Sequence, residues 1–182
     1  MIASERNQNI IVTFVIIIAL VSSVFLVNNI QAYSGSYALA GSLEVNPVRT
    51  VVRDVDPSNA SLFPIISFTF NFYTDAQLEG NVRLNFMDAA VYLNDDHLSL
   101  MSFERTLTSD ADQILYPGYD RNFTLAQASN ADSDRNTILD ANNTSTWNWY
   151  IRFRYNFIIF DESRSLTWRV LYFNWTGSTT VI

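Results

Sequence analysis

Residues 147–159 read WNWYIRFRYNFII and form the longest alternating stretch of the chain. Nearly every second side chain is aromatic or aliphatic, whereas Arg152 and Arg154 fall on the positions between. A period of two places the apolar side chains on one face of a β-strand and both arginines on the other. We therefore expect a strand with one face in a hydrophobic core. The alternative interpretation is an aromatic platform that stacks on sugars or on single-stranded nucleic acid.

Further alternating segments flank this strand on both sides. The turn Asp161-Glu162-Ser163-Arg164 leads into residues 166–172, and the two strands are expected to form a central hairpin. Upstream, Pro47 interrupts the first strand and suggests an edge position or a bulge. Pro117-Gly118 predicts a type II turn. The other expected strands cover residues 43–55, 66–72, 82–93, 98–107 and 121–126.

Seven short strands, with no helical period outside the N-terminal run, indicate an antiparallel β-sandwich of immunoglobulin-like or fibronectin-like arrangement. A lipocalin-type barrel is the alternative, although eight well-formed strands are hard to find. Residues 43–182 are enough for one such domain. Aromatic residues make up 14% of the chain and supply material for its core.

The N-terminal part of the chain contains the uncharged run IIVTFVIIIALVSSVFLV over residues 10–27. As a helix it reaches roughly 27 Å, close to the thickness of the hydrocarbon core of a bilayer. We predict a transmembrane helix over residues 10–27, preceded by a leader of residues 1–9. Residues 28–42 are small and uncharged and include two glycines, which predicts a linker to the domain at residues 43–182.

The apolar run is expected to be a retained anchor because it exceeds the roughly 7–15 apolar residues of a signal peptide. Cleavage near Ala32 or Ala40 is the alternative, since Ile30-Gln31-Ala32 and Ala38-Leu39-Ala40 both resemble small-residue cleavage sites. Arg6 precedes the run, and no charge follows it until Glu44. The positive-inside rule then places the leader in the cytoplasm and the domain outside the cell membrane.

Composition excludes several classes of function. The net charge of −7 opposes binding to phosphate backbones, so no nucleic-acid partner is expected. Cysteine is absent, which excludes disulfides and thiolate zinc sites. The expected partners are membrane lipid and other membrane or envelope proteins.

Two turns and the strands around them resemble the water-stress and hypersensitive-response (WHy) domain of the late-embryogenesis-abundant β-sandwich proteins. The resemblance covers about residues 48–176. It rests on the strand end and turn at Val91-Tyr92-Leu93-Asn94-Asp95 and on the turn Tyr116-Pro117-Gly118. Thr74-Asp75-Ala76 replaces the Asn-Pro corner of the family, and Asp95 stands where glycine is common. The resemblance implies a membrane-anchored sandwich with a protective or cell-surface role and no catalytic residues.

Catalysis is not expected. His97 is the single histidine of the chain and lies in the polar turn Asn94-Asp95-Asp96-His97. A lone histidine in such a turn is usually exposed and uninvolved, and histidine-based metal sites need several nitrogen or sulfur ligands. We therefore predict that the protein is not an enzyme.

Calcium is the one cofactor that the sequence suggests. Residues 132–136 read DSDRN and match the D-x-D-x-N opening of a calcium loop. The later glycine and glutamate of that pattern are replaced by Thr137 and Asn143. The alternative is a solvated acidic loop between strands. The candidate calcium ligands are Asp132, Asp134, Asn136 and Asp140.

The glycosylation pattern N-x-[ST] occurs five times, a mild excess over chance, and all five sites lie on the predicted outer side. The candidate acceptors are Asn59, Asn122, Asn142, Asn143 and Asn174.

These features predict a non-enzymatic single-pass membrane protein. Its extracytoplasmic β-sandwich would serve protein–protein interaction or the structure of the cell envelope. Two alternatives stay open: an accessory subunit of a larger membrane complex, and an anchored module that binds calcium or sugar.

Overall fold

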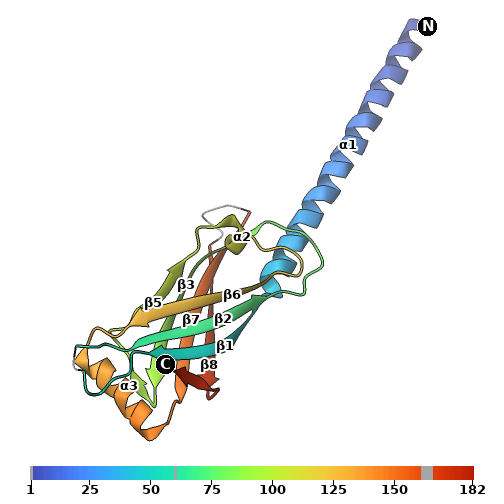
Figure 1. Cartoon of the computed structure of the whole chain (residues 1–182). Coiled ribbons are helices and arrows are strands. Elements are labelled where there is room, and N and C mark those ends of the chain that lie inside the picture. Colours follow the sequence, from blue (N-terminus) through green and yellow to red (C-terminus); the bar gives the residue numbers. More distant parts are fainter. Residues whose placement is uncertain (1, 60, 161–165) are drawn as a thin grey trace.

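Helix α1 (Ile2–Gly41) projects from one end of a domain built from strands, as the computed structural model in Figure 1 shows. The structure describes residues 2–59, 61–160 and 166–182, with the side chains of residues 2–6 left aside. The turn expected at Asp161-Glu162-Ser163-Arg164 lies outside the described residues. By length and composition, residues 7–41 form one helix able to cross a membrane, and its apolar window has no buried residue.

The structure differs from the expected linker at residues 28–42, because α1 continues through Gly41. This segment contains no proline, and extending an existing helix costs far less than starting one. Gly35 and Gly41 each lower helix stability by only about 1 kcal/mol. Ser42 ends the helix, where its backbone N–H and its hydroxyl both donate to the carbonyl of Ala38, at 2.9 and 2.8 Å.

Two sheets pack face to face and form the predicted β-sandwich. The four-stranded sheet has the order β6-β2-β1-β9. Its strands are β1 (Glu44–Arg53), β2 (Ile65–Tyr73), β6 (Asp120–Ala128) and β9 (Thr179–Val181). The five-stranded sheet has the order β4-β3-β7-β8, with β5 also paired to β3. Its strands are β3 (Val82–Leu93), β4 (Asp96–His97), β5 (Phe103–Thr106), β7 (Trp149–Ile159) and β8 (Thr167–Trp175).

The strand count and one pairing depart from the sequence prediction. The described residues form nine strands, because the short strands β4 and β9 carry no alternating pattern of their own. Strand β9 pairs with β1 in parallel, whereas the other pairings are antiparallel. The bulge suggested by Pro47 is confirmed by a register shift between Pro47 and Arg49.

The core lies between β2 and β7, whose inner faces are aromatic. The rings of Phe70 and Phe153 lie 4.3 Å apart, and those of Phe68 and Trp149 lie 5.1 Å apart. The predicted inner positions of β7 are buried, and Arg152 and Arg154 are exposed on its other side. The core interpretation of residues 147–159 is therefore confirmed for β7.

The sequence predicts a central hairpin of β7 and β8. In the structure β8 is an edge strand, so the hairpin lies at one side of its sheet. A second difference concerns β3, where the register against β7 shifts between Leu84 and Phe86. After this bulge the inward positions begin with Met87, which is fully buried, and Phe86 turns to the outer side. Bulges shift the phase of a strand in this way.

Two helices lie outside the N-terminal run, although no helical period was expected there. Helix α2 (Asp110–Gln113) is a single turn near the α1 end of the domain. Helix α3 (Asp132–Thr144) covers the opposite end (Figure 1). It ends with Ser145 in the left-handed conformation, where the N–H groups of Ser145 and Thr146 donate to the carbonyls of Asn142 and Ala141. This pattern is a Schellman cap.

Candidate functional site

The last turns of α1 are built into the domain. Leu39 is fully buried and Ala40 nearly so, and both belong to the hydrophobic core. One and a half turns earlier, the ring of Tyr33 lies 4.4 Å from that of Phe160, which follows β7. Helix α1 is therefore fixed at the start of β3 and the end of β7 rather than joined by a flexible linker.

Ser36 and Gly80 form the closest part of this junction. The buried hydroxyl of Ser36 accepts a hydrogen bond from the N–H of Asn81 at 2.8 Å and donates one to the carbonyl of Ala32 at 2.7 Å. A Cβ atom at Gly80 would clash with the backbone of Ser36. The absence of a side chain at Gly80 thus allows two backbones to touch.

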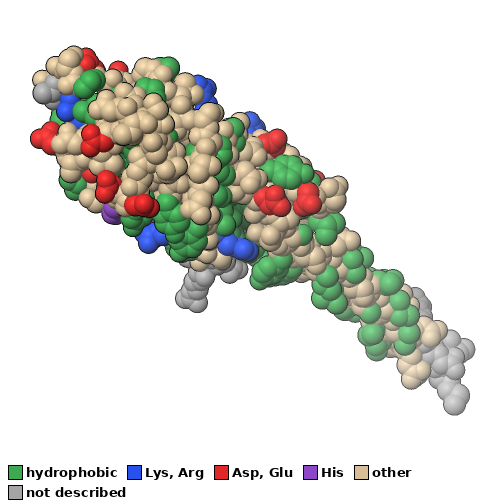
Figure 2. Space-filling model, turned by 90° about the horizontal axis from the view of Figure 1, so that it is seen from below, with side chains coloured by type: hydrophobic (Ala, Val, Ile, Leu, Met, Phe, Trp, Pro, Cys, Tyr) green, Lys and Arg blue, Asp and Glu red, His purple; other side chains and the backbone are tan. Residues whose placement is uncertain are grey.

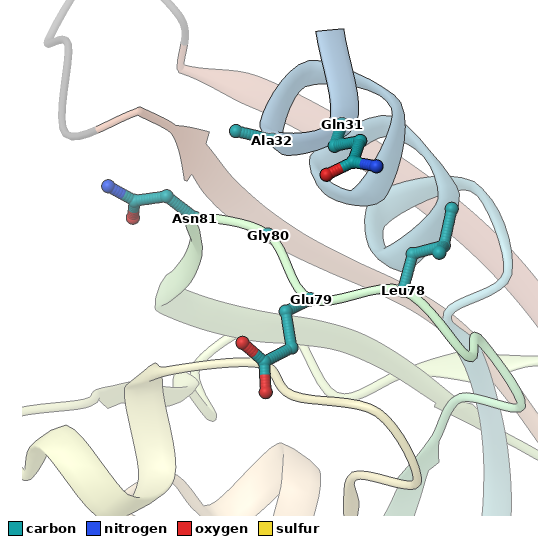
Figure 3. A pocket seen from close by; sticks show the side chains of 6 residues that line it. All are labelled: Gln31, Ala32, Leu78, Glu79, Gly80 and Asn81. Atoms are coloured by element: carbon teal, nitrogen blue, oxygen red, sulfur yellow. The ribbon is translucent and has the colours of Figure 1, made fainter. Parts of the chain in front are cut away.

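A shallow pocket of about 530 Å³ borders the junction. Figure 3 shows that the loop before β3 passes beneath the helix and that Glu79 points away from it. Its lining residues are Gln31, Ala32, Leu78, Glu79, Gly80 and Asn81. These groups offer amides and one carboxylate, and the lining residues include no acid paired with a base.

We expect Gly80→Leu to separate α1 from the domain while leaving the sandwich folded. The added side chain must displace the backbone of Ser36, which would break the hydrogen bond from Asn81. Proteolysis of the detergent-solubilised chain should become at least tenfold faster between residues 33 and 44. Gly41→Leu is the matched control, because nothing lies within 4 Å of a Cβ at Gly41. Equal cleavage of both variants would contradict the close-contact role of Gly80.

The candidate calcium ligands lie on helix α3, not on a loop. Asp132, Asn136 and Asp140 are exposed, and their four-residue spacing places them along one side of the helix. Asp134 turns inward, where its carboxylate accepts a hydrogen bond from the N–H of Leu100 at 3.2 Å. The expected loop is therefore a helix, which directs Asp134 away from the other three candidate ligands, and calcium binding stays a prediction. Among the described residues, no three His, Cys, Asp or Glu side chains form a group that could hold a metal.

Arg135 connects α3 to the loop that precedes β2. Its guanidinium is nearly buried and donates to the carbonyls of Leu62, Asn59 and Asp56 at 3.1, 3.2 and 3.3 Å. The loop that carries these carbonyls is thus attached to α3. The pKa of Asp56 is lowered, chiefly by a hydrogen bond from the hydroxyl of Ser58.

The candidate glycosylation sites are distributed over the domain. Four of the five asparagines are exposed, and Asn142 is half-buried on α3. Asn122 is on the edge strand β6, where its side chain accepts a hydrogen bond from Asn71 at 3.1 Å. Asn174 is on β8. These positions are accessible to modification, which stays a prediction.

The outer face of the five-stranded sheet carries an aromatic row that the sequence analysis missed. His97 stacks on Tyr92 at 4.5 Å, and Tyr92 contacts Tyr150 at 5.6 Å. The row continues from Tyr150 to Tyr172 at 6.2 Å, with the two rings nearly parallel. The row therefore crosses β4, β3, β7 and β8.

Beside this row lies a group of charged side chains. The guanidinium of Arg154 donates two hydrogen bonds to Asp88, at 2.7 and 2.8 Å, which raise the pKa of Arg154. The same guanidinium lies 5.5 Å from the centre of the Trp168 ring, and Trp168 contacts Phe86 at 6.2 Å. Arg152 lies between Ala90 and Tyr172 in register. We call the residues of this surface the outer face: Phe86, Asp88, Ala90, Tyr92, His97, Tyr150, Arg152, Arg154, Trp168, Val170 and Tyr172.

One sequence signal could have revealed this face. In β8, both alternating sets are apolar or aromatic: Trp168, Val170 and Tyr172 on one side, and Leu171, Phe173 and Trp175 on the other. The second set packs on the core, which leaves the first set exposed. A strand with two apolar faces in a sandwich of two layers must expose one of them.

Comparison with known proteins gives only distant likeness. No family model matches the chain, and no curated protein matches it. A Bordetella pertussis protein described as ApaA is 9% identical, with a TM-score of 0.42, and the match covers 72% of this chain and 91% of that one. A protein from Archaeoglobus fulgidus is 6% identical, with a TM-score of 0.37 over 75% of this chain and 98% of that one. Likeness at this level assigns neither a family nor an activity, and the WHy resemblance stays a prediction.

Proposed function

We propose that this chain is a non-enzymatic single-pass membrane protein that holds its β-sandwich outside the membrane for contact with other proteins or within the envelope. The observation that carries the proposal is the exposed apolar stretch of α1. Residues 7–41 contain a window with mean hydropathy 3.1, none of which is buried. Figure 2 shows hydrophobic side chains along the helix and charged side chains on the domain. Such an exposed apolar surface is stable in lipid and not in water.

Retention of the helix is supported by the way it ends. Cleavage after Ala32 or Ala40 would cut within one continuous helix, and cleavage after Ala40 would remove the core residue Leu39. A signal peptide is removed from the mature protein, so its side chains are not expected to form part of the core of the mature domain.

The lipid boundary is marked by tyrosines. Tyr33 and Tyr37 follow the apolar run and are 53% and 64% exposed. Tyrosine is enriched at membrane–water interfaces because its ring prefers the apolar side and its hydroxyl the aqueous side. Together with the single leader arginine, Arg6, this favours a cytoplasmic leader and an extracytoplasmic domain.

Contact with other proteins is supported by the composition of the outer face. Tyrosine, tryptophan and arginine dominate the binding energy of protein interfaces. The outer face presents all three types, with Tyr172 62% exposed and Trp168 46% exposed. The same observation favours the second candidate function, an accessory subunit of a larger membrane complex.

The anchor is tested on the natural membrane fraction. We expect intact mass analysis to find residues 1–41 still attached and alkaline carbonate to leave the chain in the pellet. External protease should digest the domain of intact cells and spare the helix. A mature chain that starts at Tyr33 or Gly41 and is soluble would overturn the proposal. Native mass analysis in mild detergent then separates a lone chain from an accessory subunit, which would remain in a stable heteromer.

A further inference from the structure

Strand β8 is an edge strand without the protection that the other sheet edges have. Strand β9 has three residues, and β4 and β5 have two and four. Strand β6 exposes polar side chains and no large hydrophobic one. Strand β8 has nine residues, no proline and no glycine, and it exposes Trp168, Val170 and Tyr172. Long hydrophobic edges pair readily with further strands, and natural proteins usually shorten, charge or cover them.

We infer that β8 is a strand-addition site for an extended, carboxylate-bearing segment of another polypeptide. Within the described chain, β8 pairs with β7 alone. Every second residue of an edge strand turns its N–H and C=O groups outward, so an added strand can continue the ladder. This inference rests on the proposed function, because it names the surface and the chemistry of the partner.

The charge of the hairpin selects a carboxylate-bearing partner. Strands β7 and β8 contain Arg152, Arg154 and Arg169 and no acidic residue, although the chain has a net charge of −7. Arg154 is paired with Asp88. Within the described chain, Arg152 and Arg169 are exposed and form no hydrogen bond or ion pair. A carboxylate opposite Arg169 on an added strand would lie at a cross-strand distance of about 5 Å.

A second copy in the same membrane does not fit this edge. Strand β8 starts near the helix, since Thr167 pairs with Phe157 close to the Tyr33 contact, and it ends at the far side of the domain. Two copies would therefore present β8 in parallel, related by a twofold axis along the strands. In a parallel ladder, a residue whose backbone N–H and C=O point toward the neighbouring strand is aligned with a residue whose N–H and C=O point away from it. A twofold axis aligns identical residues, so a closed dimer cannot form this ladder.

The added strand would also extend the outer face. The last column of the outer face is on β8 and consists of Trp168, Val170 and Tyr172. Their cross-strand neighbours on β7 are Asn156, Arg154 and Arg152, in that order. Apolar side chains on the partner would cover this column, while one carboxylate on the other side of the added strand would face Arg169. Leu171 and Phe173 share that side with Arg169, so the partner segment should be uncharged apart from this carboxylate.

The test uses the full chain in mild-detergent micelles and a nine-residue acetylated probe that alternates valine with threonine and carries one central glutamate in place of a threonine. Fluorescence anisotropy measures binding, and hydrogen exchange locates it. We expect saturable binding with slowed exchange confined to β8. The variant Arg169→Gln should weaken binding about twofold to fivefold, as expected for one exposed ion pair. Arg121→Gln, on the polar edge strand β6, is the matched control and should bind as the unaltered chain does.

Four results would overturn the inference: no binding at millimolar probe, equal binding of a probe with lysine for glutamate, slowed exchange away from β8, or a dimer of this chain that protects β8. Both arginines that are replaced are exposed, so thermal unfolding should match the unaltered chain. The experiment does not depend on cleavage or orientation in the membrane. Failure of the proposed anchor would therefore leave this result interpretable.

Discussion

The double substitution Ile17→Arg, Ile18→Arg is expected to abolish stable membrane insertion. The run at residues 10–27 contains fourteen Ile, Leu, Val and Phe residues. At about 0.3–0.6 kcal/mol each, they favour insertion by about 4–8 kcal/mol. An arginine near the bilayer centre costs about 2.5–3.5 kcal/mol. Two arginines therefore offset nearly the whole gain, and the chain should move from the carbonate-resistant pellet to the supernatant or be degraded.

Asn9→Arg is the control for this prediction. Position 9 is at the end of the apolar run, where a long cationic side chain can extend into the headgroup region at little cost. A cytoplasmic positive charge also favours the expected orientation. Full membrane retention of the double variant would show that the apolar run is not what holds the protein in the membrane.

Phe70→Ala should lower the free energy of unfolding of the domain by about 3–5 kcal/mol. Phe70 is fully buried and packs against Phe153 and Phe173, so its removal leaves a cavity between the two sheets. The total free energy of unfolding of a domain of this size is about 5–15 kcal/mol, so the variant should be close to unfolding. Denaturant titration in micelles, followed by tryptophan fluorescence, measures the loss.

Tyr73→Ala controls for the general effect of losing an aromatic ring from β2. Tyr73 is on the same strand but 40% exposed, so its loss should cost at most about 1 kcal/mol. Equal destabilisation by both substitutions would contradict the assignment of the core to the Phe70–Phe153 layer.

The strands could be predicted from sequence because alternation is a local property. Phe68, Phe70 and Phe72 are all buried, as a period of two requires. Helix α3 could not be found in this way, because two of its inward positions are Asp134 and Arg135. Their burial depends on Leu100 and on carbonyls more than seventy positions away in the chain, which no local pattern contains.

The outer face was missed for a related reason. The bulge after Leu84 changes the phase of β3 and turns Phe86 outward, and the apolar pattern itself does not reveal the shift. The edge position of β8 depends on which strands pair, and this pairing is determined by contacts throughout the sheet rather than by the sequence of β8 alone. The helix beyond residue 27 was missed because its small, uncharged residues are also typical of a linker. Its packing against the domain is not visible in the local sequence.

With the proposed anchor in lipid, the direct attachment of α1 to the domain leaves little clearance above the bilayer. Only residues 28–32 separate the predicted span from the turns that dock on the domain, which is about 7 Å of helix. That distance is comparable to the depth of the headgroup layer. The base of the sandwich would therefore rest among lipid headgroups, with no gap for another protein beneath it. Another protein would therefore meet the domain from the side, the direction in which β8 is open, or from the far end, where α3 lies.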